Sequence, residues 1–121
     1  DNNYADAHSN LGIALSLQGQ LKEAIKQYRK ALQINPDLFR VHGSLAILLA
    51  QIGDVSGAIS HYHHAITLYP GFARAHNNLG SALGQLGRFE EAMIYFERAI
   101  NIDPNYVDAK KNLELARSLV P

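Results

Sequence analysis

The chain of 121 residues contains no cysteine and shows no excess of charge of either sign. Without cysteine it can form no disulfide framework and no thiolate metal site. The 11 basic residues are balanced by 11 acidic ones, so the chain lacks the positive surface with which proteins usually bind phosphate backbones. The same balance gives no support for binding to an anionic membrane surface. Nucleic acids and membranes are therefore not expected partners.

Long apolar runs are also absent. No stretch approaches the roughly 18 residues of a transmembrane helix, and no secretory signal is visible at the N-terminus, so we expect a cytoplasmic protein. The chain begins at Asp1 instead of methionine, which suggests a fragment of something longer. Residues 1–121 are predicted to form one domain, because this length suffices for a single continuous core.

Proline is scarce, and three of the four prolines recur at a fixed interval. Pro36, Pro70 and Pro104 are spaced by 34 residues. A period of this length marks a stack of supersecondary units, none of which can bury its apolar face alone. Further columns keep the period, namely Leu11, Leu45, Leu79 and Leu113; Gly19, Gly53 and Gly87; Ala24, Ala58 and Ala92; Tyr28, Tyr62 and Phe96; and Ala31, Ala65 and Ala99.

Each unit is predicted to contain two helices, because apolar residues recur at helical spacing between two kinds of breaker. The recurring glycine ends the first helix, and the step before proline ends the second. First helices are expected at 4–17, 38–51 and 72–85, second helices at 21–34, 55–68 and 89–102, and a last helix at 106–119.

This pattern resembles the tetratricopeptide repeat family. That family places an aromatic residue, Leu-Gly and a second aromatic residue on the first helix, then Ala, an aromatic residue, Ala and Pro on the second. Here the two first-helix aromatic columns hold histidine and leucine, and Ala46 replaces the glycine of repeat two. Repeat one matches at Leu11, Gly12, Ala24, Tyr28, Ala31 and Pro36, and repeat three at Leu79, Gly80, Ala92, Phe96, Ala99 and Pro104.

The resemblance implies an all-α, right-handed superhelical solenoid whose first helices line a concave face. It divides the chain into repeats at 5–38, 39–72 and 73–106 and a capping helix at 107–119. In the last helix, Glu114 and Arg117 stand where the repeats have small or apolar residues, so we expect a polar outer face there. The opening residues parallel 104–114 and are expected to be the tail of a preceding unit.

No catalytic, cofactor or metal site is predicted, because the sequence shows no nucleophile motif, phosphate loop or carboxylate pair suited to catalysis. His8, His42 and His76 share one column and would lie on neighbouring helices about 8–10 Å apart. That spacing is too wide for one zinc ion, whose ligand nitrogens lie about 2.1 Å away. We expect half-buried rings whose polar tips reach a partner. His61 and His64 are expected on one exposed helix face, where only adventitious metal binding is expected.

The predicted binding surface is the concave groove. Its positions are those on the first helices that face neither the partner helix nor the neighbouring repeat. Any one of them could simply be solvated, but together they carry few of the Lys and Glu residues typical of a solvated face. They are Asp6, Ser9, Asn10, Ile13 and Ser16; Arg40, Gly43, Ser44, Ile47 and Ala50; Arg74, Asn77, Asn78, Ser81 and Gly84; and Asp108, Lys111, Asn112, Leu115 and Ser118.

One column of this groove holds Asn10, Asn78 and Asn112, with Ser44 completing it. An amide offers two donors and an acceptor, so it can pair with the backbone of an extended peptide. The column, with the phrases AHSNLG at 7–12 and AHNNLG at 75–80, resembles the repeat arm of the eukaryotic transferases that attach O-linked N-acetylglucosamine. In that arm an asparagine ladder holds substrate polypeptide.

A second mode within the family clamps the C-terminal carboxylate of heat-shock chaperones with two Lys, one Arg and two Asn. In the better of two alignments only two of these five positions fit, which disfavours a chaperone-tail receptor. The five positions hold Ser9, Ile13, Ser44, Arg74 and Asn78.

We expect a non-enzymatic scaffold that binds a peptide segment of a partner protein in the concave groove. Arg40 and Arg74, one repeat apart, favour an acidic group on that partner. One alternative is the substrate-recruiting arm of a larger enzyme such as a glycosyltransferase. The other is self-association through the first-helix face around Tyr4, which no preceding unit covers.

Overall fold

The computed structural model describes residues 2–121, with side chains from Asn3 onward, and these residues form α-helices without any strand. Asp1, the first residue of the predicted domain, lies outside the described part. The helices are α1 (Asn2–Leu17), α2 (Leu21–Ile34), α3 (Phe39–Gln51), α4 (Val55–Leu68), α5 (Ala73–Gln85), α6 (Phe89–Ile102) and α7 (Val107–Leu119).

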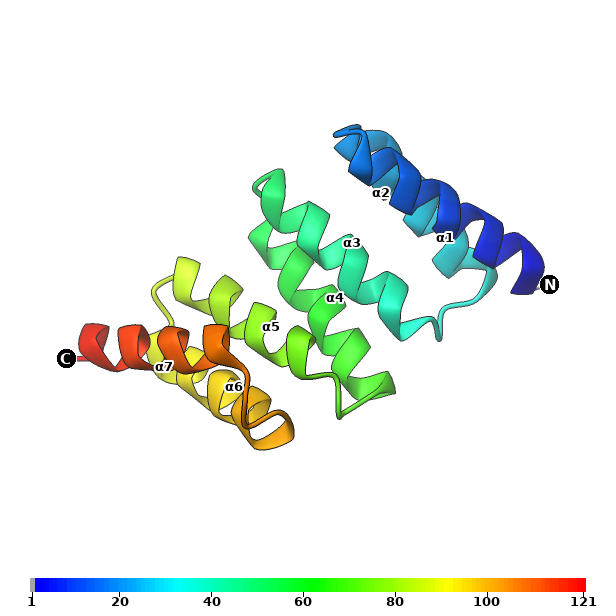
Figure 1. Cartoon of the computed structure of the whole chain (residues 1–121). Helices are drawn as coiled ribbons and strands as arrows, with labels where there is room; N and C mark the ends of the chain where they lie inside the picture. The colour runs from blue at the N-terminus through cyan, green and yellow to red at the C-terminus, as the bar shows by residue number, and fades with distance from the viewer. Residues whose placement is uncertain (1) are drawn as a thin grey trace.

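The helices pack in successive pairs, α1 with α2, α3 with α4 and α5 with α6, and the pairs stack in chain order with α7 at the end (Figure 1). The first helices form one layer, and the second helices form the layer behind it. The predicted all-α solenoid is confirmed. None of the helices within residues 2–121 combines the length and the apolar content that a bilayer crossing requires.

Glycine ends the first helices at the predicted positions. Gly19, Gly53 and Gly87 have φ angles of 78°, 92° and 77°, the left-handed conformation that a residue without Cβ adopts readily. The second helices also end where predicted, because the residue before each proline is extended. Asn35, for example, has φ −138° and ψ 97°.

The helices α3, α5 and α7 begin one residue later than predicted. Leu38, Phe72 and Tyr106 have ψ values of 88°, 83° and 93°, so each is the N-cap residue and lies just outside its helix. In these three residues the apolar side chain indicated a helical position, but the backbone is still turning out of the proline loop.

Small residues let the two helices of a unit pack closely. Ala24 and Ala92 are fully buried. A Cβ added to Gly80 would lie 2.5 Å from Cε1 of Phe96, so that ring lies directly against the glycine. Glycine at this position therefore allows the two helices of the unit to approach closely.

The first helix is exposed where the later first helices are buried. Leu11 is 47% exposed, whereas Leu45 and Leu79 are fully buried and Leu113 is 8% exposed. Each later first helix packs against the second helix of the unit before it, and among the described residues no helix covers α1 in this way. The outer surface of α1 therefore carries an uncovered apolar strip that includes Tyr4, which is 67% exposed.

The last helix differs from the repeats on its outer side. It packs Ala109, Leu113 and Ala116 toward the preceding unit, while Glu114 and Arg117 are exposed.

Candidate functional site

The positions expected to line the groove lie on α1, α3, α5 and α7, and most of them are accessible. The charged members and two uncharged members on each of α1 and α7 are exposed, most small and amide members are half-buried, and two residues are buried, contrary to expectation. The exposed set is Asp6, Asn10, Ile13, Arg40, Arg74, Asp108, Lys111, Leu115 and Ser118; the half-buried set is Ser9, Ser16, Ser44, Ile47, Ala50, Asn78, Ser81, Gly84 and Asn112; the buried residues are Gly43 and Asn77.

Asn77 does not face an open groove, contrary to expectation. It is 6% exposed, and its Oδ1 accepts a hydrogen bond of 3.0 Å from Nδ2 of Asn112 on α7. The Asn77 side chain also hydrogen-bonds Tyr106. The physical reason is the position of α7, which lies against this face of α5 and covers it.

Two positions of the asparagine column, Asn78 and Ser44, lie next to buried tyrosines of the second helices. Asn78 hydrogen-bonds the Tyr62 hydroxyl, and burial raises the pKa of Tyr62 to about 12 despite this bond. Ser44 makes the equivalent bond to Tyr28, whose pKa burial also raises. Both tyrosines are therefore neutral near pH 7. An amide engaged by one hydroxyl retains further donor and acceptor capacity toward the groove.

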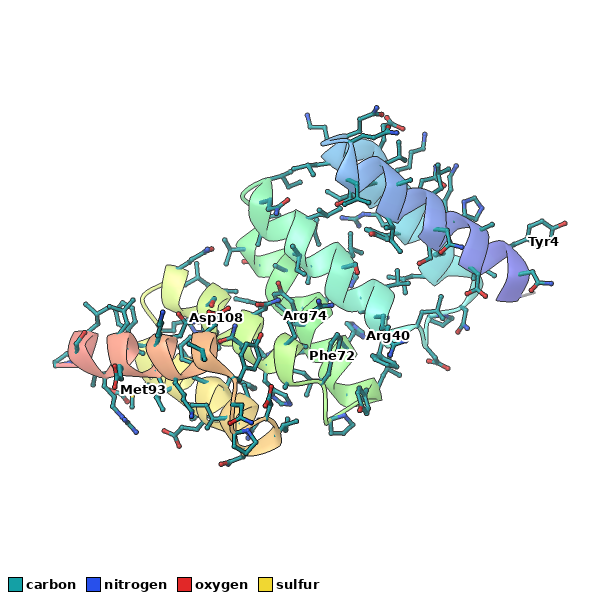
Figure 2. All side chains as sticks on the ribbon, viewed as in Figure 1. Tyr4, Arg40, Phe72, Arg74, Met93 and Asp108 are labelled. Atoms are coloured by element: carbon teal, nitrogen blue, oxygen red, sulfur yellow. The ribbon has the colours of Figure 1, made fainter. Side chains whose placement is uncertain are left out.

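Charged residues line the edge of the groove that is formed by the N-terminal turns of α3, α5 and α7. Figure 2 shows Arg40, Arg74 and Asp108 following one another across α3, α5 and α7. The Arg40 guanidinium lies 5.3 Å from the centre of the Phe39 ring, and that of Arg74 lies 5.9 Å from the centre of Phe72.

Neither guanidinium forms an ion pair with a carboxylate in residues 2–121. The ion pair found among residues 2–121 joins Arg88 to Glu91, away from the groove. Arg40 and Arg74 therefore keep charge for an external acidic group.

Three hollows follow the groove. The first, of about 300 Å³, lies between α1 and α3 and is bordered by Asp6, Ser9 and Arg40. The second lies between α3 and α5, with a volume of about 240 Å³. The third lies between α5 and α7, with a volume of about 400 Å³. Some of the lining side chains that the groove pattern omitted come from the second helices, namely Tyr62, Phe89, Ala92 and Phe96, and the 34-residue register could have identified them. Most of the others come from further positions of the first helices and of α7, such as Gln51, Gln85 and Leu119.

Two histidines of the column hydrogen-bond the loop that precedes their helix. Nε2 of His42 donates to the carbonyl of Pro36, and Nε2 of His76 donates to the carbonyl of Pro70, each at 2.8 Å. His8 contacts Gln27 Oε1 through Nδ1 at 2.7 Å. The expected polar partners of this column are therefore present, and in two repeats the partner is the proline loop before the helix.

The structure contains a cluster of histidines around His42 that the sequence analysis did not predict. Nδ1 of His61 lies 3.0 Å from Nδ1 of His42, and the His64 ring stacks on His42 with ring centres 5.0 Å apart. Since Nε2 of His42 donates to Pro36, its Nδ1 accepts from His61. His61 is half-buried, not on a fully exposed face, and burial followed by proximity to His42 lowers its pKa to about 4. No group of three potential ligands in residues 2–121 has a geometry that could hold a metal ion.

Comparisons with known proteins bear on the whole architecture. The sequence model of the tetratricopeptide repeat matches residues 5–38 and 73–106, which is more than half of the chain. No curated protein sequence matches it.

Many solved structures share the fold. The structure titled "First TPR of Spaghetti (RPAP3) bound to HSP90 peptide SRMEEVD" has a TM-score of 0.95 at 24% identity, covering 98% of this chain and 94% of that one. The crystal structure of MamA has a TM-score of 0.93 at 24% identity, covering 98% and 69%. The Arabidopsis OM64 TPR domain has a TM-score of 0.95 at 19% identity, covering 98% of each chain. With the sequence match and the paired-helix stack, they lead to one assignment: the chain belongs to the tetratricopeptide repeat family.

Proposed function

We propose that the chain is a protein-interaction scaffold that binds a polypeptide segment of a partner in its concave groove. The observation that carries the proposal is the series of three hollows along α1, α3, α5 and α7, bordered by small, amide and charged side chains. Tetratricopeptide repeats are protein-interaction modules, and a structurally similar domain was solved with a bound peptide.

The chemistry of the groove favours a partner with an acidic group. Arg40 and Arg74 lie one repeat apart and are exposed, and neither has an ion-pair partner in the described part of the chain. A carboxylate between the two guanidinium groups would receive charge-assisted hydrogen bonds. We do not propose that this chain binds an HSP90 peptide as the similar structure does. Only Arg74 and Asn78 carry the required residue type among the five clamp positions.

The asparagine column supports binding of extended backbone. Asn10, Asn78 and Asn112 occupy equivalent positions on three first helices, and amides there can pair with peptide groups whatever the partner's side chains. This column also supports the alternative of a substrate-recruiting arm resembling that of O-linked N-acetylglucosamine transferases. Two forms of a longer chain, one that contains residues 1–121 and one from which they are deleted, would be compared in an assay of N-acetylglucosamine transfer. If the deletion abolishes transfer to protein substrates but not to short peptides, the recruiting arm is favoured over the scaffold.

Self-association is the second alternative, and the exposed apolar strip of α1 favours it. Light scattering over a dilution series tests it directly. A mass that stays that of one chain from micromolar to millimolar concentration would exclude it.

The groove proposal is tested with an array of decapeptides of random sequence whose termini are acetylated and amidated. Binding of the labelled chain to the array is compared with that of the labelled Asn10→Ala/Asn78→Ala variant. Asn112 is left in place, because removing it would leave the buried Asn77 without its partner. Loss of two hydrogen bonds of about 1 kcal/mol each should weaken the bound peptides about 10- to 30-fold. Peptides that bind both proteins equally, with equal melting temperatures, would contradict the groove proposal.

A further inference from the structure

The largest hollow of the groove is also its most apolar one. It lies between α5 and α7, with Phe89 and Phe96 of α6 beneath and Leu115 and Leu119 of α7 along one wall. These leucines are 60% and 48% exposed. They form an apolar wall that no described part of the chain covers.

An internal comparison shows how this hollow differs from its equivalent. The hollow between α3 and α5 lies at the same place one repeat earlier and is smaller, about 240 Å³ against about 400 Å³. There Ile47 and Ala50 stand on the α3 wall, whereas Ser81 and Gly84 form the α5 wall of the larger hollow. On the opposite wall, Ser81 and Gln85 are replaced one repeat later by Leu115 and Leu119. In the larger hollow the α5 wall thus carries smaller side chains, and the α7 wall more apolar ones, than the equivalent walls one repeat earlier.

The fold itself does not require glycine at position 84. A Cβ added to Gly84 would meet no heavy atom within 4 Å, whereas one added to Gly80 would lie within 3 Å of the Phe96 ring. Glycine inside a helix is less favourable than alanine. The effect of Gly84 that remains is to leave space in the wall of the hollow.

We propose that the hollow between α5 and α7 receives one large apolar side chain of an extended partner segment, whose acidic residue pairs with Arg74. This inference rests on the proposed groove function and adds the chemistry of the ligand. Charge complementarity supports the acidic residue, since Arg74 and the neighbouring Arg40 have no acidic partner within residues 2–121. Asn78 lies between Arg74 and Gly84 on the same helix, in reach of the segment's backbone.

The geometry fixes a spacing in the ligand. Arg74 and Gly84 are ten residues apart on α5, which corresponds to about 15 Å along the helix axis at about 1.5 Å per residue. An extended chain covers this distance in about four to five residues at about 3.3 Å each. The acidic and apolar residues should therefore have about three to four residues between them.

The test uses blocked peptides with one Glu and one Leu separated by one to eight serines, measured by fluorescence anisotropy. Affinity should be highest with three or four serines and should fall at least 10-fold when Leu is replaced by Ser or Glu by Gln. Gly84→Leu should remove the preference for Leu, and Arg74→Gln the preference for Glu. Ser60→Leu, which places the same side chain on an exposed position of α4, is the matched control and should change neither.

A second variant, Leu115→Ser, removes the apolar wall at an exposed position and should have the same effect as Gly84→Leu. Unchanged affinity and spacing preference in both variants would overturn the anchor proposal. Absence of binding by the unsubstituted chain at every spacing would also overturn it. In either case the groove function stands if random decapeptides still bind and are weakened by Asn10→Ala/Asn78→Ala.

Discussion

At the scale of single residues, two glycines of α5 have different surroundings. Gly80 leaves room for a buried ring of the same unit, and Gly84 leaves room in an open hollow. Their substitution by alanine should therefore have effects of opposite sign on stability.

Gly80→Ala should lower the free energy of unfolding by about 1–2 kcal/mol, because the added methyl group forces the Phe96 ring to move. Gly84→Ala should raise it by about 0.5–1 kcal/mol, because the helix gains propensity without a clash. Urea unfolding followed by circular dichroism measures both. Equal effects of the two substitutions would show that Gly80 is not needed for close approach.

At the scale of elements, the same leucine column has two energetic roles. Leu79 on α5 is fully buried, while Leu11 on α1 is 47% exposed. Leu79→Ala should cost about 2–5 kcal/mol through lost burial and a cavity, whereas Leu11→Ala should cost no more than about 1 kcal/mol. Denaturant midpoints of the two variants provide the comparison. A loss at Leu11 as large as that at Leu79 would mean that the α1 strip is covered in solution.

The elements themselves could largely be predicted from the sequence, because glycine and proline act locally. The second helices have their predicted bounds since each ends at an X-Pro step. The surroundings of a side chain could not be predicted as well. Asn77 was placed in the groove by its register, but its burial depends on Asn112 of α7 and on Tyr106, the residue just before that helix.

The binding role of the groove stays a prediction. The sequence identified its column of amides, but not its most apolar hollow, which combines side chains from three helices. Nor could it identify the cluster around His42, because the proximity of His61 depends on how α4 packs against α3.

At the scale of the whole molecule, stability should depend on pH through three buried or half-buried histidines. Burial is the main cause that lowers the pKa of His42, His61 and His76 below the ordinary value of 6.5, in His61 to about 4. Neighbouring charges act on His61 in both directions, Arg29 lowering its pKa and Asp54 raising it.

Because the folded pKa is lower than the unfolded one, the unfolded chain binds more protons between these values. Stability should thus be full above pH 6.5 and fall as the pH drops from about 6.5 toward about 4. Urea midpoints between pH 7.5 and pH 4 measure this slope, which should be shallower in His61→Gln.

The exposed His63 on the same helix is the matched control, since it lies outside the cluster around His42. His63→Gln should leave the slope unchanged. A slope that His61→Gln does not alter would show that the cluster does not contribute to acid sensitivity.

The histidine–proline bonds have a consequence for the curvature of the stack. In two joints the ring of a first helix is bonded to the carbonyl of the loop that precedes it, at Pro36 and at Pro70. The corresponding position of α7 holds Lys110, which has no imidazole to make this bond. At two joints a hydrogen bond thus ties the first helix to the preceding loop in addition to apolar packing, whereas the third joint has apolar packing and the Asn77–Asn112 pair. The joint without the histidine is also the one that forms the largest hollow of the groove, so a ligand side chain bound there would help to set the pitch at that end of the solenoid.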